Sequence, residues 1–423
     1  MTRMKDSGNP WVREIPSDWF EKKLRYLVKL RGEKSVTTDY KKYVGLENIM
    51  SQTGQYVQTG IEVDLTENLT FEVGDILFGK LRPYLRKYWR AEFSGTASSE
   101  FVIIKGSSLN LNFLFWAIQS DSFINDVDSS TYGSKMPRAS WEYMKNIKLP
   151  FPESIEEQTQ IADFLDKKVA QLDKVKSLLE EQIKTLEDYR QSLIYETVTK
   201  GLDKTVPLKD SGVDWIGQIP EGWGVKPIKY LVSTPVTDGP HETPTLYDEG
   251  IPFLSAESVK NGILDFRYKR GYISETAHKI FSRKVSPQKN DIFIVKSGAT
   301  TGNVGIVTTD EIFDIWSPLA LVRTRSDLAN QKFIYYFMLS DAFTKQIQNK
   351  WSFGTQQNIG MGVIEKIKLV VPPLGEQTPI ADFLDKKTEQ INQMIAIKKE
   401  QIENINKQRQ TLIYDYVTGK RRI

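Results

Sequence analysis

The most regular pattern of apolar positions lies in two long stretches of the chain. Between residues 154 and 199 there is no proline or glycine, and leucine recurs every seven residues. This row consists of Leu165, Leu172, Leu179, Leu186 and Leu193. Near the C-terminus, Leu384, Ile391, Ile405 and Leu412 keep the same spacing, with Lys398 at the remaining position. An apolar seam at this spacing predicts two coiled-coil helices of about 43 residues, or about 65 Å, each.

The start of each predicted helix is a repeat. EQTQIADFLDKK at 157–168 returns as EQTPIADFLDKK at 376–387, and at the same offset Arg190-Gln191 matches Arg409-Gln410. Such a repeat indicates two similar halves, each a globular block followed by a helix. We therefore expect blocks at 1–152 and 201–373, with helices at 153–200 and 374–423.

Each predicted helix needs a partner, because alone it would expose its apolar seam to water. We expect the two helices of one chain to pair as an antiparallel coiled coil with a pseudo-two-fold axis. The alternative is a coiled coil between two chains. The polar seam residue Lys398 either fixes the register or extends its charged end outward.

Within each block the pattern changes to short apolar runs between turns, which predicts strands. The expected strands are Tyr43–Ile49, Phe71–Gly79, Tyr88–Phe93, Glu100–Ile104, Pro252–Ser255, Asp291–Val295, Gly305–Val307 and Leu319–Arg323. GDILF at 74–78 and NDIFIV at 290–295 mark equivalent strands. One helix is expected in each block, at Asn112–Asn125 and Gln331–Asn349, so the fold class is α+β.

The two blocks also begin alike. Trp11 and Trp19 flank an Ile-Pro pair, as Trp215 and Trp223 do in the second block. We expect these indoles to be buried and to clamp an entry loop onto each block.

Composition narrows the classes of function. The chain has 423 residues, no cysteine, two histidines and a net charge of +3. Disulfides and thiolate metal sites are excluded, and His241 and His278 lack the neighbours that a metal needs, so no metal site is expected. No apolar run has membrane-spanning length and no signal peptide is evident, so we expect a soluble, cytoplasmic protein without a membrane partner.

One stretch of the first block combines basic and aromatic residues. GKLRPYLRKYWR at 79–90 contains the candidate DNA-binding residues Lys80, Arg82, Tyr84, Arg86 and Lys87. Arginine and lysine bind phosphates or the O6/N7 edge of guanine, and tyrosine packs against sugars and methyl groups. The alternative is a solvated basic hairpin.

The matching stretch of the second block is IVKSGATTGNVG at 294–305. Its glycines allow a close approach of the backbone, and its candidate contacts are Lys296, Ser297, Thr300, Thr301 and Asn303. It is not a P-loop, because no Gly-Lys-Ser/Thr follows at the required spacing.

Polar loops at equivalent positions of the two blocks supply the remaining candidates. These are Ser134, Lys135 and Arg138 in the first block and Gln356, Gln357 and Asn358 in the second, with His241 in the turn DGPHE at 238–242. Amides pair with adenine and cations with guanine or phosphate. Solvated loops without a ligand are the alternative.

Catalysis is not indicated by any motif. The chain contains no methyltransferase Asp/Asn-Pro-Pro-Tyr/Phe motif and no dinucleotide-binding glycine motif. A sequence near Asp18 resembles the acidic-x-Lys motif of nucleases, but its residues are too closely spaced. We therefore expect no catalytic residues.

The repeated EQ-x-x-IADFLDKK and RQ-[ST]-LIY segments, with the order block–helix–block–helix, resemble the specificity subunit of type I restriction–modification enzymes. The segments GLENI (45–49), GDILFGKLRPYLRK (74–87) and KSGATTGNVG (296–305) are similar to that family's target-recognition domains. The resemblance covers essentially the whole chain.

This resemblance implies a DNA-binding subunit without an active site or cofactor. Each block would read one half of a bipartite, asymmetric DNA site, and the helices would set the spacer and dock two methyltransferase subunits. S-adenosylmethionine, ATP and Mg would be bound by those partners and by restriction subunits. The alternative is a coiled-coil scaffold whose blocks bind protein or carbohydrate; a standalone nuclease would require metal-dependent cleavage by the pure chain.

Overall fold

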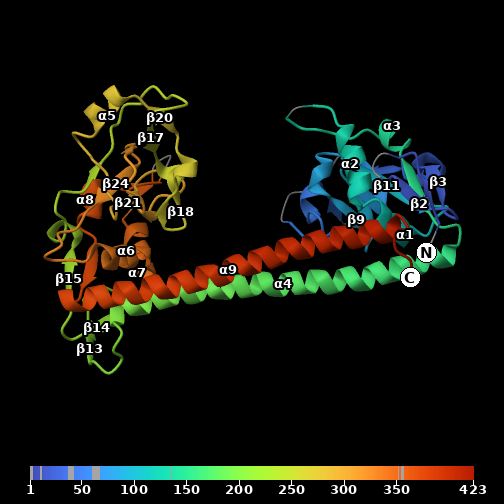
Figure 1. The fold of residues 1–423 in the computed structure, drawn as a ribbon. Helices are drawn as coiled ribbons and strands as arrows, with labels where there is room; N and C mark the ends of the chain where they lie inside the picture. Colours follow the sequence, from blue (N-terminus) through green and yellow to red (C-terminus); the bar gives the residue numbers. More distant parts are fainter. Residues whose placement is uncertain are drawn as a thin grey trace. The chain divides into compact units, whose positions relative to one another are not determined.

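The computed structural model describes residues 3–9, 12–36, 42–59, 67–133, 135–350, 352–353 and 357–423. The chain divides into two compact units (Figure 1). Unit 1 is Met1–Glu181 with Lys398–Ile423, and unit 2 is Gln182–Ile397. Each unit therefore contains one globular block and one half of each long helix.

The two predicted long helices are confirmed. They are α4 (Ile155–Lys200) and α9 (Leu374–Val417), with 46 and 44 residues. Each helix has acidic residues in its first turn. Their negative charge stabilises the helix because it lies at the positive end of the helix dipole. Gly201 and Gly419 follow the two helix ends with φ of +73° and +72°. Glycine adopts this left-handed conformation without steric cost and so ends the helix.

Antiparallel pairing of the helices is seen inside each unit. In unit 1 the rings of Phe164 and Tyr416 lie 4.5 Å apart, and Arg409 Nε lies 3.5 Å from Asp173 Oδ1. The partner's number falls as the position on α4 rises, which is the mark of antiparallel helices. In unit 2, Arg190 donates to Asn392 Oδ1 over 2.5 Å. The helices therefore pair within one chain.

Burial varies along the predicted seam. Leu165, Leu384 and Ile391 are buried. The other seam residues are half-buried: Leu172, Leu179, Leu186, Leu193, Ile405 and Leu412. Val175 and Tyr189, each three residues after a seam leucine, are exposed.

Two four-stranded sheets form the block of unit 1. One has the order β4-β11-β8-β9 and the other β5-β7-β10-β6. The first contains β4 (Val28–Leu30), β11 (Phe101–Ser107), β8 (Ile76–Gly79) and β9 (Tyr88–Arg90). The second contains β5 (Lys34–Val36), β7 (Glu67–Phe71), β10 (Gly95–Ala97) and β6 (Tyr43–Val44). Two antiparallel pairs complete the block: β1 (Met4–Asp6) with β2 (Glu14–Pro16), and β3 (Phe20–Lys23) with β12 (Lys148–Phe151).

Unit 2 has a six-stranded sheet, β16-β24-β21-β22-β19-β18, and a three-stranded sheet, β20-β17-β23. The larger contains β16 (Thr237–Asp238), β24 (Leu319–Val322), β21 (Ile292–Val295), β22 (Val304–Ile306), β19 (Ile263–Leu264) and β18 (Val259–Lys260). The smaller contains β20 (Gly271–Ile273), β17 (Ile251–Leu254) and β23 (Asp314–Ile315). The remaining pairs are β13 (Leu208–Asp210) with β14 (Gln218–Pro220), β15 (Gly224–Pro227) with β27 (Lys368–Val371), and β25 (Ser352–Phe353) with β26 (Gln357–Asn358).

The single helix predicted in each block is wrong, because each prediction covers two helices. The first block has α1 (Leu111–Ala117), α2 (Asp121–Ser129) and the short α3 (Trp141–Met144). The second has α5 (Glu275–Phe281), α6 (Gln331–Leu339), α7 (Asp341–Gln348) and α8 (Met361–Ile364). Ser120 and Ser340 lie at the breaks, where their hydroxyls donate to the carbonyls of Ala117 and Phe337. A serine that bonds the local backbone in this way competes with helix continuation.

The strand predicted at Tyr43–Ile49 is also too long. After Val44 the chain turns into the 3-10 helix η2 (Leu46–Asn48), where Asn48 Oδ1 accepts from the backbone N–H of Gly45 over 2.8 Å. This side-chain bond favours the turn over a continued strand.

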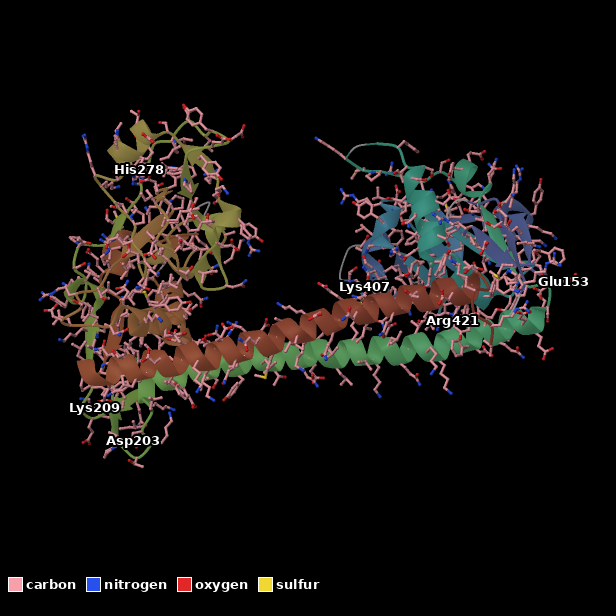
Figure 2. The ribbon with its side chains drawn as sticks, viewed as in Figure 1. Glu153, Asp203, Lys209, His278, Lys407 and Arg421 are labelled. Atoms are coloured by element: carbon pink, nitrogen blue, oxygen red, sulfur yellow. The ribbon has the colours of Figure 1, made fainter. Side chains whose placement is uncertain are left out.

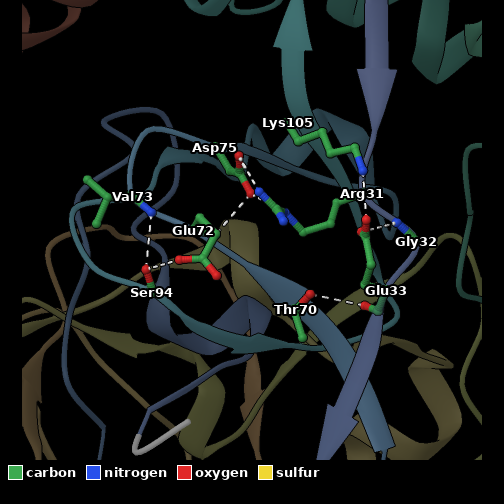
Figure 3. Close-up of polar contacts among 9 residues, drawn as sticks. All are labelled: Arg31, Gly32, Glu33, Thr70, Glu72, Val73, Asp75, Ser94 and Lys105. Carbon is green, nitrogen blue, oxygen red and sulfur yellow. Dashed lines mark hydrogen bonds and ion pairs between the residues drawn. The ribbon is translucent and has the colours of Figure 1, made fainter.

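Strands β8 and β21 are equivalent, as predicted from GDILF and NDIFIV. Asp75 accepts from the backbone N–H of Glu72 over 2.9 Å and from Arg31 Nε over 2.6 Å (Figure 3). Asp291 likewise accepts from the backbone N–H of Gln288 over 2.7 Å and from Arg323. In both units the hydrogen bonds from the guanidinium to the aspartate raise the pKa of the arginine.

Two of the predicted entry-loop indoles are buried beneath helix ends. A Cβ on Gly201 would lie 3.0 Å from the Trp223 ring, and a Cβ on Gly419 would lie 3.1 Å from the Trp19 ring. Trp215 is exposed, so the prediction is wrong there, and Trp11 lies outside the described residues. None of the described helices has the length and apolar character needed to cross a membrane.

Candidate nucleic-acid interface

In the first block, two loops that are distant in sequence join next to strand β8. The backbone N–H of Ala139 donates to the carbonyl of Lys80 over 2.9 Å, and that of Arg82 donates to Pro137 over 2.7 Å. Leu81 and Arg138 form a β-bridge between these contacts. The basic stretch and the polar loop therefore form one surface.

The second block joins its two predicted loops in the same way. The backbone N–H of Ile359 donates to the carbonyl of Lys296 over 2.7 Å, and Ser297 and Asn358 form the bridge. Lys296 also donates from its backbone to Pro318 over 2.8 Å, as Lys80 does to Glu100. The equivalence predicted between the two loop pairs is confirmed.

The exposed residues of the first loop pair are cationic and aromatic. Arg82, Tyr84, Lys135 and Arg138 are exposed, and Lys80 is half-buried. Arg82 Nη2 donates to the carbonyl of Lys135 over 3.1 Å, and Arg138 pairs with Glu100 at 2.5 Å. Ser134 lies outside the described residues. This surface offers donors suited to phosphates and to the guanine edge.

Arg86 is directed into the unit rather than into solvent. Its guanidinium pairs with Asp121 at 2.5 Å and donates to Gln410 Oε1 of α9 over 3.3 Å. Together with α9 it lines a cavity of about 430 Å³, which also borders Lys407. Lys407 is labelled in Figure 2. The structure thus gives Arg86 bonds that connect the loop to the helix.

Lys87 also differs from a solvent-facing DNA contact. Its Nζ donates to the carbonyls of Leu46 and Ile49, both over 2.7 Å. Burial of this ammonium lowers the pKa of Lys87. The side chain holds the 3-10 turn against β9, which a count of basic residues in the sequence does not reveal.

The second loop pair is rich in hydroxyl and amide groups. Thr300, Asn303 and Asn358 are exposed, and Ser297 and Gln357 are half-buried. Thr301 is buried and its Oγ1 donates to the carbonyls of Gly298 and Gln357, so it holds the loops together. Gln356 lies outside the described residues.

Beside this loop pair lies a charged cluster that sequence reasoning missed in part. Asp238 is fully buried, with Lys284 Nζ 2.6 Å from Oδ1, and with Lys296 Nζ at 2.6 Å and His241 Nε2 at 3.1 Å from Oδ2. Burial raises the pKa of Asp238, but the hydrogen bond from Lys284 and the ion pair with Lys296 outweigh it and leave the pKa below its usual value. The sequence signal was the turn DGPHE, but nothing local links Lys284 to it.

The two histidines contact aspartates. His278 on α5, labelled in Figure 2, lies with Nδ1 2.6 Å from Asp314 Oδ2. Within the described ranges, no group of three or more His, Asp or Glu side chains is arranged to hold a metal ion. The two loop surfaces present cations, amides and hydroxyls on loops that are joined by backbone hydrogen bonds. These groups suit recognition of phosphates and base edges.

Comparison with known proteins agrees with this geometry. A family model described as the type I restriction modification DNA specificity domain matches residues 16–187 and 220–405. The two matched segments each contain most of one block and most of the helix that follows it.

Individual proteins extend the comparison over the whole chain. The type I restriction enzyme MjaVIII specificity subunit of Methanocaldococcus jannaschii is 25% identical, over 97% of this chain and 94% of its own length. The EcoBI specificity subunit of Escherichia coli is 22% identical, over 69% of this chain and 63% of its own. A chain from a structural study of complex assembly and conformational transition of the type I R-M system is 18% identical. It matches with a TM-score of 0.71 and covers 96% of this chain and 99% of that one, which shows a shared fold.

Proposed function

This chain belongs to the type I restriction modification DNA specificity family, and we propose which part of the DNA site each of its two blocks recognises. The chain is a DNA-binding specificity subunit with two target-recognition domains, and the catalytic activities belong to other subunits. In our proposal the block of unit 1 reads one half of a bipartite, asymmetric site and the block of unit 2 reads the other.

One observation carries this division. Both blocks join two loops at the same edge of equivalent strands, yet the exposed groups differ. The first surface presents Arg82, Lys135 and Arg138, which suit guanine and phosphate, whereas the second presents Asn358 and the half-buried Gln357, which suit adenine. Two domains that recognise different DNA sequences need the same backbone arrangement with different contacting side chains, and this is what the two blocks have.

The long helices have a separate role in the proposal. They set the number of unread base pairs between the half-sites and dock two methyltransferase subunits. Those partners would bind S-adenosylmethionine and methylate adenine, and restriction subunits would use ATP and Mg. We accordingly propose target-recognition domains at 1–152 and 201–373 and spacer helices at 153–200 and 374–423. The matches give no support to a scaffold that binds protein or carbohydrate.

The test is a methylome. The chain is co-expressed with its native methyltransferase partner in a host without adenine methylation, and the DNA is sequenced by a modification-sensitive method. We expect a two-part motif with a fixed gap that disappears when this chain is omitted.

Variants then assign the halves of the motif. Arg82→Ala should relax one half only, and Asn358→Ala should relax the other half only. A partner that is active and abundant but shows no chain-dependent motif would contradict the proposal. Loss of both halves in either variant would contradict the division between blocks.

A further inference from the structure

Block 2 contains a buried carboxylate surrounded by three basic side chains. Asp238 ends strand β16 and contacts Lys284, Lys296 and His241 over 2.6, 2.6 and 3.1 Å. A single carboxylate balances one positive charge, whereas the cluster contains two lysine ammonium groups. The cluster therefore keeps an excess of positive charge even when His241 is neutral.

The charged side chains of this cluster differ in their exposure to solvent. The side chain of Asp238 is 0% exposed and that of Lys296 14%, whereas Lys284 is 45% and His241 70% exposed. The negative charge thus lies beneath a positive surface. A buried carboxylate persists only when it is paired, so these contacts hold the basic side chains in fixed orientations.

The backbone beneath the cluster is equally constrained. A Cβ on Gly239 would lie 2.1 Å from the carbonyl oxygen of Ile315, so only glycine fits at this close approach. Lys284 Nζ also donates to the carbonyl of Gly239 over 3.0 Å. The turn that carries His241 is therefore held in a single conformation against β23.

The cluster is continuous with the candidate reading surface. Lys296 belongs to the loop that bridges to Asn358, and the backbone N–H of Ser317 donates to the carbonyl of Pro240 over 3.2 Å. A ligand that reaches Asn358 and Thr300 along this edge thus has the basic cluster beside it. Phosphates flank every base that a protein reads, and phosphate contacts set the protein's register on the duplex.

We propose that Lys284, Lys296 and His241 form a binding site for a backbone phosphate of the half-site read by block 2. Asp238 is its positioning residue. This inference rests on the proposed function, because it requires block 2 to bind DNA. The inference adds Asp238 and Lys284 to the residues proposed to act in DNA binding. It also makes the side chain of Lys296 a phosphate contact rather than a base contact.

Among the described residues of the first block, no carboxylate takes the place of Asp238. Asp238 pairs with Ala320 of β24, and the sheet registers make Ala320 equivalent to Val102 of β11. If the β4 register opposite β11 is continued two residues beyond Leu30, Gly32 takes the position of Asp238. The device is therefore specific to the second half-site.

The test is the isosteric variant Asp238→Asn in the complex with the methyltransferase partner. The probe is a duplex that carries the wild-type motif. We expect affinity for this duplex to fall about tenfold and the slope of log affinity against log salt to shrink by about one. The two-part methylation motif should stay the same, because a phosphate contact carries no sequence information. Unchanged or increased affinity would overturn the proposal, because a carboxylate that only repels DNA gives that result when it is neutralised.

Two further variants keep the proposal open to refutation if Asp238→Asn does not fold. Lys284→Gln and His241→Ala change exposed side chains, and each should weaken binding about threefold, with Lys284→Gln reducing the salt slope by about one. An unchanged affinity and slope in Lys284→Gln overturns the phosphate site.

The matched control is Asp291→Asn. Asp291 is also buried and paired with a cation, Arg323, but it precedes β21, whereas Lys296 follows that strand. This control should lower stability without changing the affinity for the duplex or the salt slope. A wild-type complex that produces no two-part motif would instead contradict the proposed function itself, and the present inference with it.

Discussion

Arg82 and Arg86 flank the 3-10 helix η3 (Pro83–Leu85) and have different surroundings. Arg82 is exposed beside Lys135, whereas Arg86 bonds Asp121 and Gln410. We expect Arg82→Ala to reduce discrimination at the first half-site by about 1–3 kcal/mol while stability stays unchanged.

Arg86→Ala should instead lower the free energy of unfolding by about 1–2 kcal/mol, because Asp121 and Gln410 lose a charged donor. Urea denaturation and methylome sequencing of both variants separate the two effects. Equal stability of the two variants would show that the Arg86 contacts contribute nothing to folding.

Glu21 provides a pH-dependent prediction. It lies on β3, and its Oε1 is buried without a hydrogen-bond partner among the described residues. Burial raises the pKa of Glu21 above its usual 4.5, against a smaller opposing effect of Lys148. A raised folded-state pKa means that the folded protein binds the proton more tightly than the unfolded chain.

Stability from this group is therefore present below about pH 4.5 and is lost as pH rises through the raised pKa. We expect Glu21→Gln to be more stable than the wild type at pH 7, by about 1 kcal/mol. The difference should shrink toward pH 4.5 in urea denaturation. A difference that does not depend on pH would assign the gain to packing rather than to charge.

At the level of elements, Lys398 is the polar residue in the apolar seam of α9. It is half-buried, and its counterpart in the first repeat is Leu179. Lys398→Leu should raise the free energy of unfolding by about 1 kcal/mol, because apolar area replaces a charged side chain in the seam. The urea midpoint of the full chain measures this. A lower midpoint would show that the contacts of the Lys398 ammonium stabilise the helix pair more than leucine does.

For the whole molecule, the proposed spacer role predicts how helix length affects the DNA site. Insertion of seven residues after Glu181 in α4 and seven after Ile397 in α9 keeps the heptad pattern and lengthens both helices. Seven residues add about 10.5 Å at 1.5 Å per residue, which is about three base pairs at about 3.4 Å each.

We expect the methylome motif of this double insertion to gain about three unread base pairs, or modification to be lost. The comparison is with a variant that carries substitutions, but no insertion, at the same positions. An unchanged gap in an active complex would refute the spacer role.

Several features of the fold follow from local sequence alone. The long helices follow from apolar residues every seven positions, and the two equivalent units follow from the repeat at 157–168 and 376–387. The structure agrees with these predictions because helix formation depends on residues within one or two turns of each other. The helix breaks at Ser120 and Ser340 were missed because a single hydroxyl bond to the backbone outweighed the surrounding apolar pattern.

The sequence by itself determined the two blocks, the paired helices, the family and the place of the loops that join next to β8 and β21. Only the tertiary structure decided which charged side chains on those loops face solvent. Lys87 reaches the carbonyl of Leu46, 41 residues away, and Lys284 reaches Asp238, 46 residues away. Periodicity records which face of an element is buried, but the partner of a charge depends on how distant segments pack. The candidate site therefore required the fold as well as the sequence.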